Sequence, residues 1–215
     1  MSLVPRRTSW RAARFTVVDI ETTGLDPRRD QLISFAAVPV EGGRVVPGRA
    51  VSGLVRPAAP PSPRSVEIHG LRAQDLAAAP PPAQALAPLM GALRHRILVA
   101  HVAAVERAFL RFHRGRLERR LPRPEVDTAL LWRLLSIQRG RGDPGQRSLA
   151  DLTASLGLPA HRPHEAEGDA LTTAQAFLAL ATHLEAHGYG TMAALTGAGW
   201  RVRAWRLVHE RDARL

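Results

Sequence analysis

Three apolar runs in the first quarter of the chain constrain its fold more than any other feature. Residues 15–20, 32–40 and 45–55 are rich in valine and other apolar residues that favour strands. The Gly42-Gly43 pair predicts a tight turn between the second and third runs, so these strands are expected to be antiparallel neighbours. The chain therefore predicts a sheet that begins with a meander of three strands.

Helical and strand-like patterns alternate after this meander. Short apolar runs at residues 97–100 and up to Val126 indicate two further strands, and helical spacing of apolar residues lies between and after them. This alternation predicts an α/β fold with a mixed sheet. The expected helices span residues 83–94, 103–117, 148–156 and 165–187, and a further helix, capped by Asp127, continues through residue 135. Residues 56–63 should form an extended loop, and residues 139–147 should form a flexible basic loop.

Two acidic residues, Asp19 and Glu21, end the first apolar run. Side chains alternate across a strand, so both carboxylates project to the same face. Thr22, Thr23 and Gly24 follow, so the chain turns directly after the acids and leaves them at an open strand end. Such a pair suits a hard divalent cation such as Mg²⁺ or proton chemistry, and the alternative is a solvated sheet edge.

Composition points to a nucleic-acid partner and excludes cysteine chemistry. The 215-residue chain is 45% hydrophobic, which allows one ordinary domain with a real core. Its net charge is +11, and all 30 basic residues are arginines. Such a chain attracts polyanions, although a generic basic surface would have the same composition. The absence of cysteine excludes disulfides, thiolate zinc sites and cysteine nucleophiles.

The two ends of the chain differ from its middle. The first 14 residues are interrupted by arginines and lack an apolar stretch of signal-peptide or transmembrane length, so a cytoplasmic protein without a membrane partner is expected. We predict a main domain over residues 1–187 and a basic tail over residues 188–215. Trp200 and Trp205 in this tail could stack on nucleic-acid bases or pack on the body of the protein.

A second group of candidate site residues lies around the start of the last long helix. Asp169 falls in its first turns, and His164 precedes it on the incoming loop. A histidine on a loop can turn toward a substrate while the helical acid stays fixed, which suits a general base beside a metal ligand. One alternative is an ordinary polar helix start, in which Glu165 and Glu167 interact favourably with the helix dipole. Another is that His161, rather than His164, is the base.

Four sequence blocks together resemble the DEDDh 3′–5′ exonucleases, a family that includes the proofreading epsilon subunit of bacterial DNA polymerase III. The blocks are DIETTGLDP, IHGL, AHVAAVERAFL and HRPHEAEGDA, and the match runs over residues 10–184. The resemblance implies a ribonuclease H-like, mixed five-stranded sheet flanked by helices. It also implies two divalent cations, Mg²⁺ or Mn²⁺, and release of nucleoside 5′-monophosphates from the 3′ end of DNA, most simply single-stranded. A DNA polymerase is a candidate partner.

The resemblance assigns roles residue by residue. Asp19 and Glu21 match the first-motif metal ligands, Asp169 the last-motif ligand and His164 the general base. Further positions match substrate-contact residues, and Asp127 matches an aspartate that we interpret as a helix cap and positioning residue. The substrate-contact positions are Thr22, Gly24, Leu25, His69 and His101.

The second motif departs from the family pattern. The family usually has His-Asn and then Phe-Asp, whereas here His101 is followed by Val102, and Val105-Glu106 stand where Phe-Asp would be. Glu106 is one methylene longer than aspartate, and Mg²⁺ tolerates such a change of reach poorly, so Glu106 binds metal directly or through water. Two alternatives remain open: an exoribonuclease of the same family, and a nucleic-acid-binding module that lost catalysis through this change.

Overall fold

A six-stranded mixed sheet runs through the computed structural model, which describes residues 7–113, 121 and 124–212. The strand order is β3-β2-β1-β5-β6, with β4 also paired to β2. Strand β1 is antiparallel to β2 and parallel to β5, and β5 is parallel to β6. The strands are β1 (Arg14–Thr22), β2 (Leu32–Glu41), β3 (Arg44–Val45), β4 (Val51–Leu54), β5 (Ile97–Ala100) and β6 (Glu125–Asp127).

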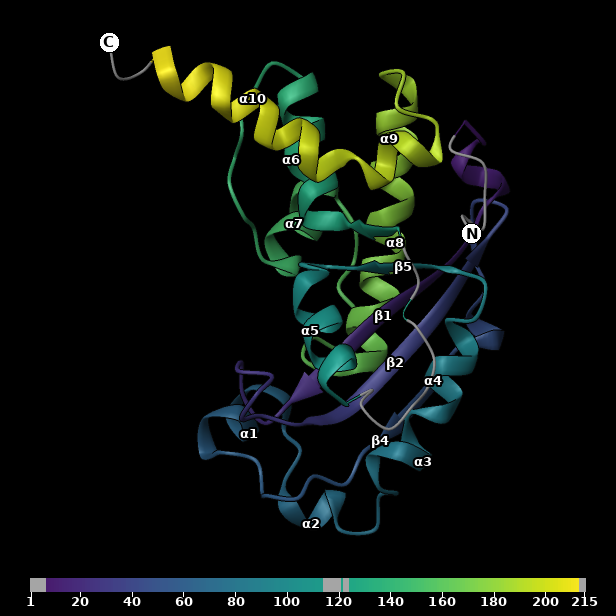
Figure 1. Ribbon diagram of the computed structural model, residues 1–215, viewed down its shortest axis with the longest axis vertical. Coiled ribbons are helices and arrows are strands. Elements are labelled where there is room, and N and C mark those ends of the chain that lie inside the picture. Colours follow the sequence, from purple (N-terminus) through teal and green to yellow (C-terminus); the bar gives the residue numbers. More distant parts are fainter. Residues whose placement is uncertain (1–6, 114–120, 122–123, 213–215) are drawn as a thin grey trace.

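Helices cover both faces of this sheet (Figure 1). One face packs on α6, α7 and α8, with α9 and α10 beside them, and the other packs on α3, α4 and α5. Trp10 and Phe15 meet Phe177 of α8 at ring-centroid distances of 5.9 and 4.7 Å in the first of these cores. The helices are α1 (Pro63–His69), α2 (Ala73–Leu76), α3 (Pro82–Ala85), α4 (Ala87–Ala92), α5 (Ala104–His113), α6 (Thr128–Gln138), α7 (Leu149–Leu156), α8 (Ala166–Ala186), α9 (Met192–Thr196) and α10 (Ala198–Asp212).

The predicted α/β, ribonuclease H-like fold is confirmed, but the sheet has six described strands rather than five. The expected third strand is interrupted at Pro47, where a 3₁₀ turn (Pro47–Arg49) separates β3 from β4. Proline removes a backbone donor, so it cannot continue a strand ladder there. The helix expected over residues 83–94 is likewise two short helices, α3 and α4, and part of the helix expected over 103–117 lies outside the described residues.

Residues before β1 pair with residues after α8, and the tail extends this core. Trp10 N donates to Gly190 O at 3.1 Å, Met192 N donates to Thr8 O at 3.0 Å, and Ser9 forms a bridge with Thr191. In the tail, Ala198 and Val202 are buried in the α8-side core. The division at residue 187 stays a prediction.

The two tail tryptophans differ in their surroundings. Trp200 is 71% exposed, whereas Trp205 is half-buried and stacks on His209 with ring centroids 4.3 Å apart. Of the two expectations for the tail, packing on the body of the protein therefore applies to Trp205 and not to Trp200. Within the described part of the chain, no helix is long and apolar enough to cross a membrane.

Candidate active site

Strand alternation and helix packing bring three carboxylates together. Phe15 and Val17 of β1 point into the core on the α8 side, and Asp19 and Glu21 continue the same face toward the strand end. Asp169 lies in the first turn of α8, which packs across this face. One carboxylate oxygen from each of Asp19, Glu21 and Asp169 lies within 4.8 Å of the other two. The structure thus places these three predicted ligands in one half-buried group.

Glu106 approaches this group from the first turn of α5, directly after β5. Its side chain is buried, with 5% of the residue exposed, and Oε2 has no hydrogen-bond partner among the described residues. Glu106 is outside the group defined by the 4.8 Å separation, but its charge is close enough to raise the pKa of Asp19. A buried carboxylate oxygen without a partner favours a cation or a bound water beside it.

Burial raises the pKa values of all four acids, and repulsion from other acids of the group adds to the shift at Asp19 and Glu21. Burial raises the pKa of Asp19 well above its ordinary value, and Glu106, Glu21 and Asp169 add to this shift. Burial, and then Asp169, raises the pKa of Glu21 to about 8, and burial, with a contribution from Asp127, raises that of Glu106 to about 8. The pKa of Asp169 is also raised by burial. Four crowded oxygen donors that repel one another fit hard divalent cations, which would relieve the repulsion.

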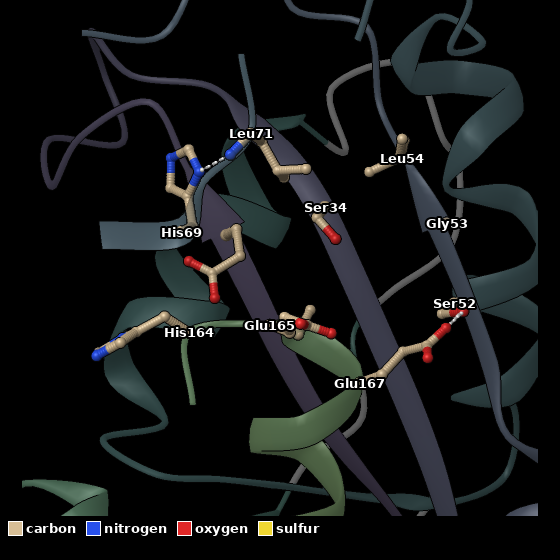
Figure 2. A pocket seen from close by; sticks show the side chains of 11 residues that line it. Ser34, Ser52, Gly53, Leu54, His69, Leu71, His164, Glu165 and Glu167 are labelled. Atoms are coloured by element: carbon tan, nitrogen blue, oxygen red, sulfur yellow. Dashed lines mark hydrogen bonds between the residues drawn. The ribbon is translucent and has the colours of Figure 1, made fainter. Parts of the chain in front are cut away.

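His164 is held beside Asp169 by its backbone rather than by its ring. Its N–H donates to Asp169 Oδ2 at 2.8 Å, and its φ of 64° is left-handed. The side chain is exposed, and Figure 2 shows it directed away from Glu165 and Glu167. The loop can fold this closely onto α8 because Gly168 has no side chain, since a Cβ there would lie 2.1 Å from His161 O.

A cavity of about 340 Å³ opens next to Glu21 and His164 (Figure 2). Its other walls include Ser34 of β2, Ser52 of β4 and His69 at the end of α1. His69 Nδ1 accepts from Leu71 N at 3.1 Å, and burial lowers the pKa of this imidazole while the nearby Thr22 carbonyl opposes the shift. The structure therefore places His69 at the cavity wall.

The comparisons with known proteins identify the family. A family model described as Exonuclease (RNase_T) matches residues 16–177, which is more than half of the chain. The chain belongs to the DEDDh 3′–5′ exonuclease family.

Two relatives of this chain are named as DNA polymerase III proteins. A DNA polymerase III subunit epsilon-like protein from Rhodobacter capsulatus is 35% identical over 184 residues, which is 84% of this chain and 25% of that protein. A PolC-type DNA polymerase III from Thermotoga petrophila is 35% identical over 172 residues, covering 80% of this chain and 12% of that protein. The chain thus spans a quarter or less of the length of these two relatives.

Two solved structures share its fold. Exonuclease X, in a complex with 5′ overhanging duplex DNA, has a TM-score of 0.65 and 26% identity over 85% of this chain and 99% of that one. Escherichia coli exonuclease I, in a complex with a dT13 oligonucleotide, has a TM-score of 0.70 and 19% identity over 82% of this chain and 42% of that one.

Three of the remaining predicted substrate residues lie where β1 ends and in the turn after it. Thr22 ends β1 and donates to Gly24 O, while Leu25 is 88% exposed on the turn that follows. None of these three lines the cavity beside Glu21. Their contact with substrate stays a prediction.

His101 uses both ring nitrogens within the protein. Nδ1 lies 3.0 Å from Thr128 Oγ1 and Nε2 lies 2.9 Å from Arg147 O, and burial lowers the pKa of the ring. In this arrangement His101 positions the segment after β5, and direct substrate contact by its ring stays a prediction.

Asp127 confirms its predicted role as a cap. Its carboxylate accepts from Ala129 N at 2.9 Å at the start of α6, and also from Val102 N and Ala103 N in the turn before α5. Val102 there has a φ of 61°, a left-handed conformation that a β-branched residue adopts only under strain. The asparagine usual in the family would fit this conformation more easily.

The sequence interpretation missed the serine side of the cavity. Ser34 pairs in register with Glu21 across β1 and β2, and Ser52 Oγ donates to Glu167 Oε1. Alternation on β2 was a usable signal for Ser34, because Ala36 of the same face pairs with Asp19. No signal in the sequence connects Ser52 with Glu167, which are 115 residues apart.

Proposed function

We propose that this protein is a metal-dependent 3′–5′ exonuclease that releases nucleoside 5′-monophosphates from the 3′ end of DNA, single-stranded at the site of cleavage. The observation that carries the proposal is the group of Asp19, Glu21 and Asp169, whose ligand oxygens lie within 4.8 Å of one another. The raised pKa values in this group support a cation at the site, because a cation restores the ionised carboxylates.

The residues fit a pair of Mg²⁺ or Mn²⁺ ions. Asp19, Glu21 and Asp169 would hold them, with Glu106 as a further ligand directly or through water. When bound, the cations would neutralise the attacked phosphate and the leaving oxygen, and would make a water molecule more acidic.

The side chains of the protein supply the remaining chemistry. His164 accepts a proton from the attacking water after its ring turns inward from the exposed position. The backbone bond to Asp169 keeps the His164 loop next to the ligands during this rotation. The resulting hydroxide attacks the phosphorus in line, the bond to the 3′ oxygen of the preceding nucleotide breaks, and this oxygen takes up a proton from solvent. The cavity beside Glu21 and His69 receives the terminal nucleotide.

Similar proteins support DNA as the substrate and a polymerase as a partner. The solved complexes of exonuclease X and exonuclease I contain DNA, and two relatives are named as DNA polymerase III proteins or subunit-like proteins. We propose DNA on this basis and a DNA polymerase as a candidate partner.

A gel assay with 5′-end-labelled oligonucleotides tests this function. We expect wild type to shorten single-stranded DNA stepwise with Mg²⁺ or Mn²⁺ and to be inactive in EDTA. Asp19→Asn and Asp169→Asn should lose digestion and keep DNA binding, because each removes a ligand charge and leaves the surface unchanged. Full turnover by either variant would contradict the proposal.

The same assay separates the two alternatives. A matched RNA oligonucleotide that is digested faster than DNA would identify an exoribonuclease, because only a site that reads the 2′-hydroxyl distinguishes the two. Binding without digestion under any metal would identify a module without catalysis.

A further inference from the structure

The loop over residues 139–147, between α6 and α7, carries three exposed arginines, Arg139, Arg141 and Arg147. Its single acid does not neutralise them at the surface. Asp143 has a side chain only 7% exposed and accepts from Arg133 Nε at 2.8 Å and from Gly145 N at 3.0 Å. These hydrogen bonds of Asp143 hold a segment that we predicted to be flexible. The charges of its exposed arginines remain directed to solvent.

The middle of this loop lies against α10. Arg206 Nε is 3.7 Å from Asp143 Oδ2, and a Cβ built on Gly142 would contact the Trp205 ring at 3.8 Å. Helix α10 adds the exposed Arg203, three residues before Arg206. Figure 1 shows the loop running from beside α10 down one side of the molecule to the start of α7.

The C-terminal end of the loop reaches the candidate active site. Arg147 O lies 2.9 Å from His101 Nε2, and His101 is near enough to Asp169 for the two groups to influence each other's pKa. His101 also lies at the end of β5, in the segment that leads to Glu106. The exposed arginines of residues 139–147 and Arg203 of α10, here called the arginine track, therefore lie on a loop that contacts His101 near the site and on the helix that this loop contacts.

We propose that the arginine track binds the phosphates of the substrate strand on the 5′ side of the nucleotide being removed. This inference rests on the proposed function, because a strand whose 3′ end is cleaved at the carboxylates must leave the site along some surface. Each nucleotide carries one negative charge, and arginine forks bind phosphate oxygens in two-point contacts. Continuity with the site favours nucleic acid over an acidic protein as the partner of this surface.

A salt titration tests the arginine track independently of catalysis. Binding of a long single-stranded DNA is measured in EDTA for wild type and for the triple variant Arg139→Gln, Arg141→Gln, Arg147→Gln. Each lost phosphate contact lowers the slope of log affinity against log salt by about 0.7, so we expect a total decrease of about 2. Wild type should then lose about 16-fold more affinity than the variant between about 50 and about 200 mM salt.

A matched control corrects for the change in net charge. Arg14, Arg44 and Arg94 are exposed arginines at the opposite end of the sheet, where β1 and β3 begin and β5 is approached. The triple variant Arg14→Gln, Arg44→Gln, Arg94→Gln has the same net charge as the first variant, and we expect it to keep the wild-type slope. A slope that falls equally in both variants, or in neither, would overturn the proposal.

Substrate length supplies the kinetic readout. With Mg²⁺, the track variant should hydrolyse a dinucleotide with unchanged kcat and KM, and should show a raised KM with unchanged kcat only on the long strand. A KM raised equally on both substrates would place these arginines in the site itself and would also overturn the proposal.

The two proposals fail separately. If wild type hydrolyses neither substrate while the track variant still lowers the salt slope, the proposed function fails and the arginine track stands as a nucleic-acid surface. If wild type hydrolyses both substrates while the slope and length dependence do not change in the variant, the track fails, and an acidic protein becomes its candidate partner.

Discussion

At the scale of single residues, Glu106 tests whether a longer acid can serve where the family has aspartate. Its Oε2 is buried without a hydrogen-bond partner among the described residues, and its charge acts on Asp19. We expect Glu106→Gln to lose nearly all exonuclease activity, because the amide removes the ligand charge, and Glu106→Asp to remain active. Metal-dependent digestion rates give the comparison, and a Glu106→Gln variant as fast as wild type would show that Glu106 is not a ligand.

His164 allows its ring to be separated from its backbone. The N–H, not the imidazole, bonds to Asp169, and asparagine tolerates the left-handed φ of 64°. We therefore expect His164→Asn to lower kcat by about 10²–10⁴-fold, as for loss of a general base, and to leave cation affinity close to wild type. Titration with Mn²⁺ beside single-turnover kinetics measures both quantities, and a parallel loss of cation affinity would mean that the substitution disturbs the ligands.

The meeting of Asp19, Glu21 and Asp169 could be predicted from the sequence, whereas other details of the site could not. Strand alternation places Asp19 and Glu21 on one face, and the family motifs place Asp169 beside them. By contrast, the partners of His101 lie 27 and 46 residues further along the chain, so local spacing does not reveal that both ring nitrogens are occupied. The outward direction of His164 was equally hidden, because a loop position does not fix a rotamer.

At the scale of elements, the turn between β5 and α5 carries a correctable strain. Val102 holds a left-handed φ of 61° while its N–H is bound by Asp127. We expect Val102→Asn to raise the free energy of unfolding by about 1 kcal/mol and the melting temperature by about 2–4 °C, because asparagine adopts this conformation at lower cost.

Val105→Asn is the matched control for this prediction. Val105 is 38% exposed and lies within α5, where asparagine is a poorer helix former than most residues and relieves no strain. Thermal unfolding of the two variants beside wild type decides the matter. Equal changes in both variants would indicate that the backbone at Val102 is not strained.

Element boundaries followed from the sequence where a single residue dictates them. Asp127 caps α6, as predicted, and the helix expected to end at residue 156 does so because Gly157 follows with a left-handed φ of 66°. The break in the third strand was signalled by Pro47, but the pattern of apolar residues continued past it and outweighed that signal. The split between α3 and α4 at Leu86 was signalled by Pro88 in the first turn of α4, but apolar residues continue at helical spacing through both helices and outweighed that signal.

At the scale of the whole molecule, the crowded acids couple stability to pH and to metal. Glu21 and Glu106 have folded-state pKa values of about 8, above the ordinary 4.5, so the folded protein binds their protons more tightly than the unfolded chain. Their contribution to stability is therefore complete below about pH 4.5 and is lost as the pH rises through about 8. We expect the metal-free protein to melt at a lower temperature at about pH 8 than at about pH 6.

Divalent cations should reverse this loss. At a concentration a hundred times the dissociation constant, a bound cation adds about 2.7 kcal/mol, or about 5–10 °C in melting temperature for a chain of this size. The gain should be larger at the higher pH, where fewer protons compete for the ligands. Calorimetry in EDTA and in Mn²⁺ measures it, with Asp169→Asn as the control that should show little gain, and a pH-independent gain would contradict the coupling.

The pairing of Thr8, Ser9 and Trp10 with Gly190, Thr191 and Met192 has a consequence for synthesis of the protein. A nascent chain exposes β1 early, yet the segment before it finds its partners only after almost the whole domain has left the ribosome. Closure of the core is therefore a late, long-range event, and such contacts slow folding because a large loop must close first. Until then, the apolar hairpin of β1 and β2 can pair with other chains, and we therefore expect chaperones to bind the emerging polypeptide.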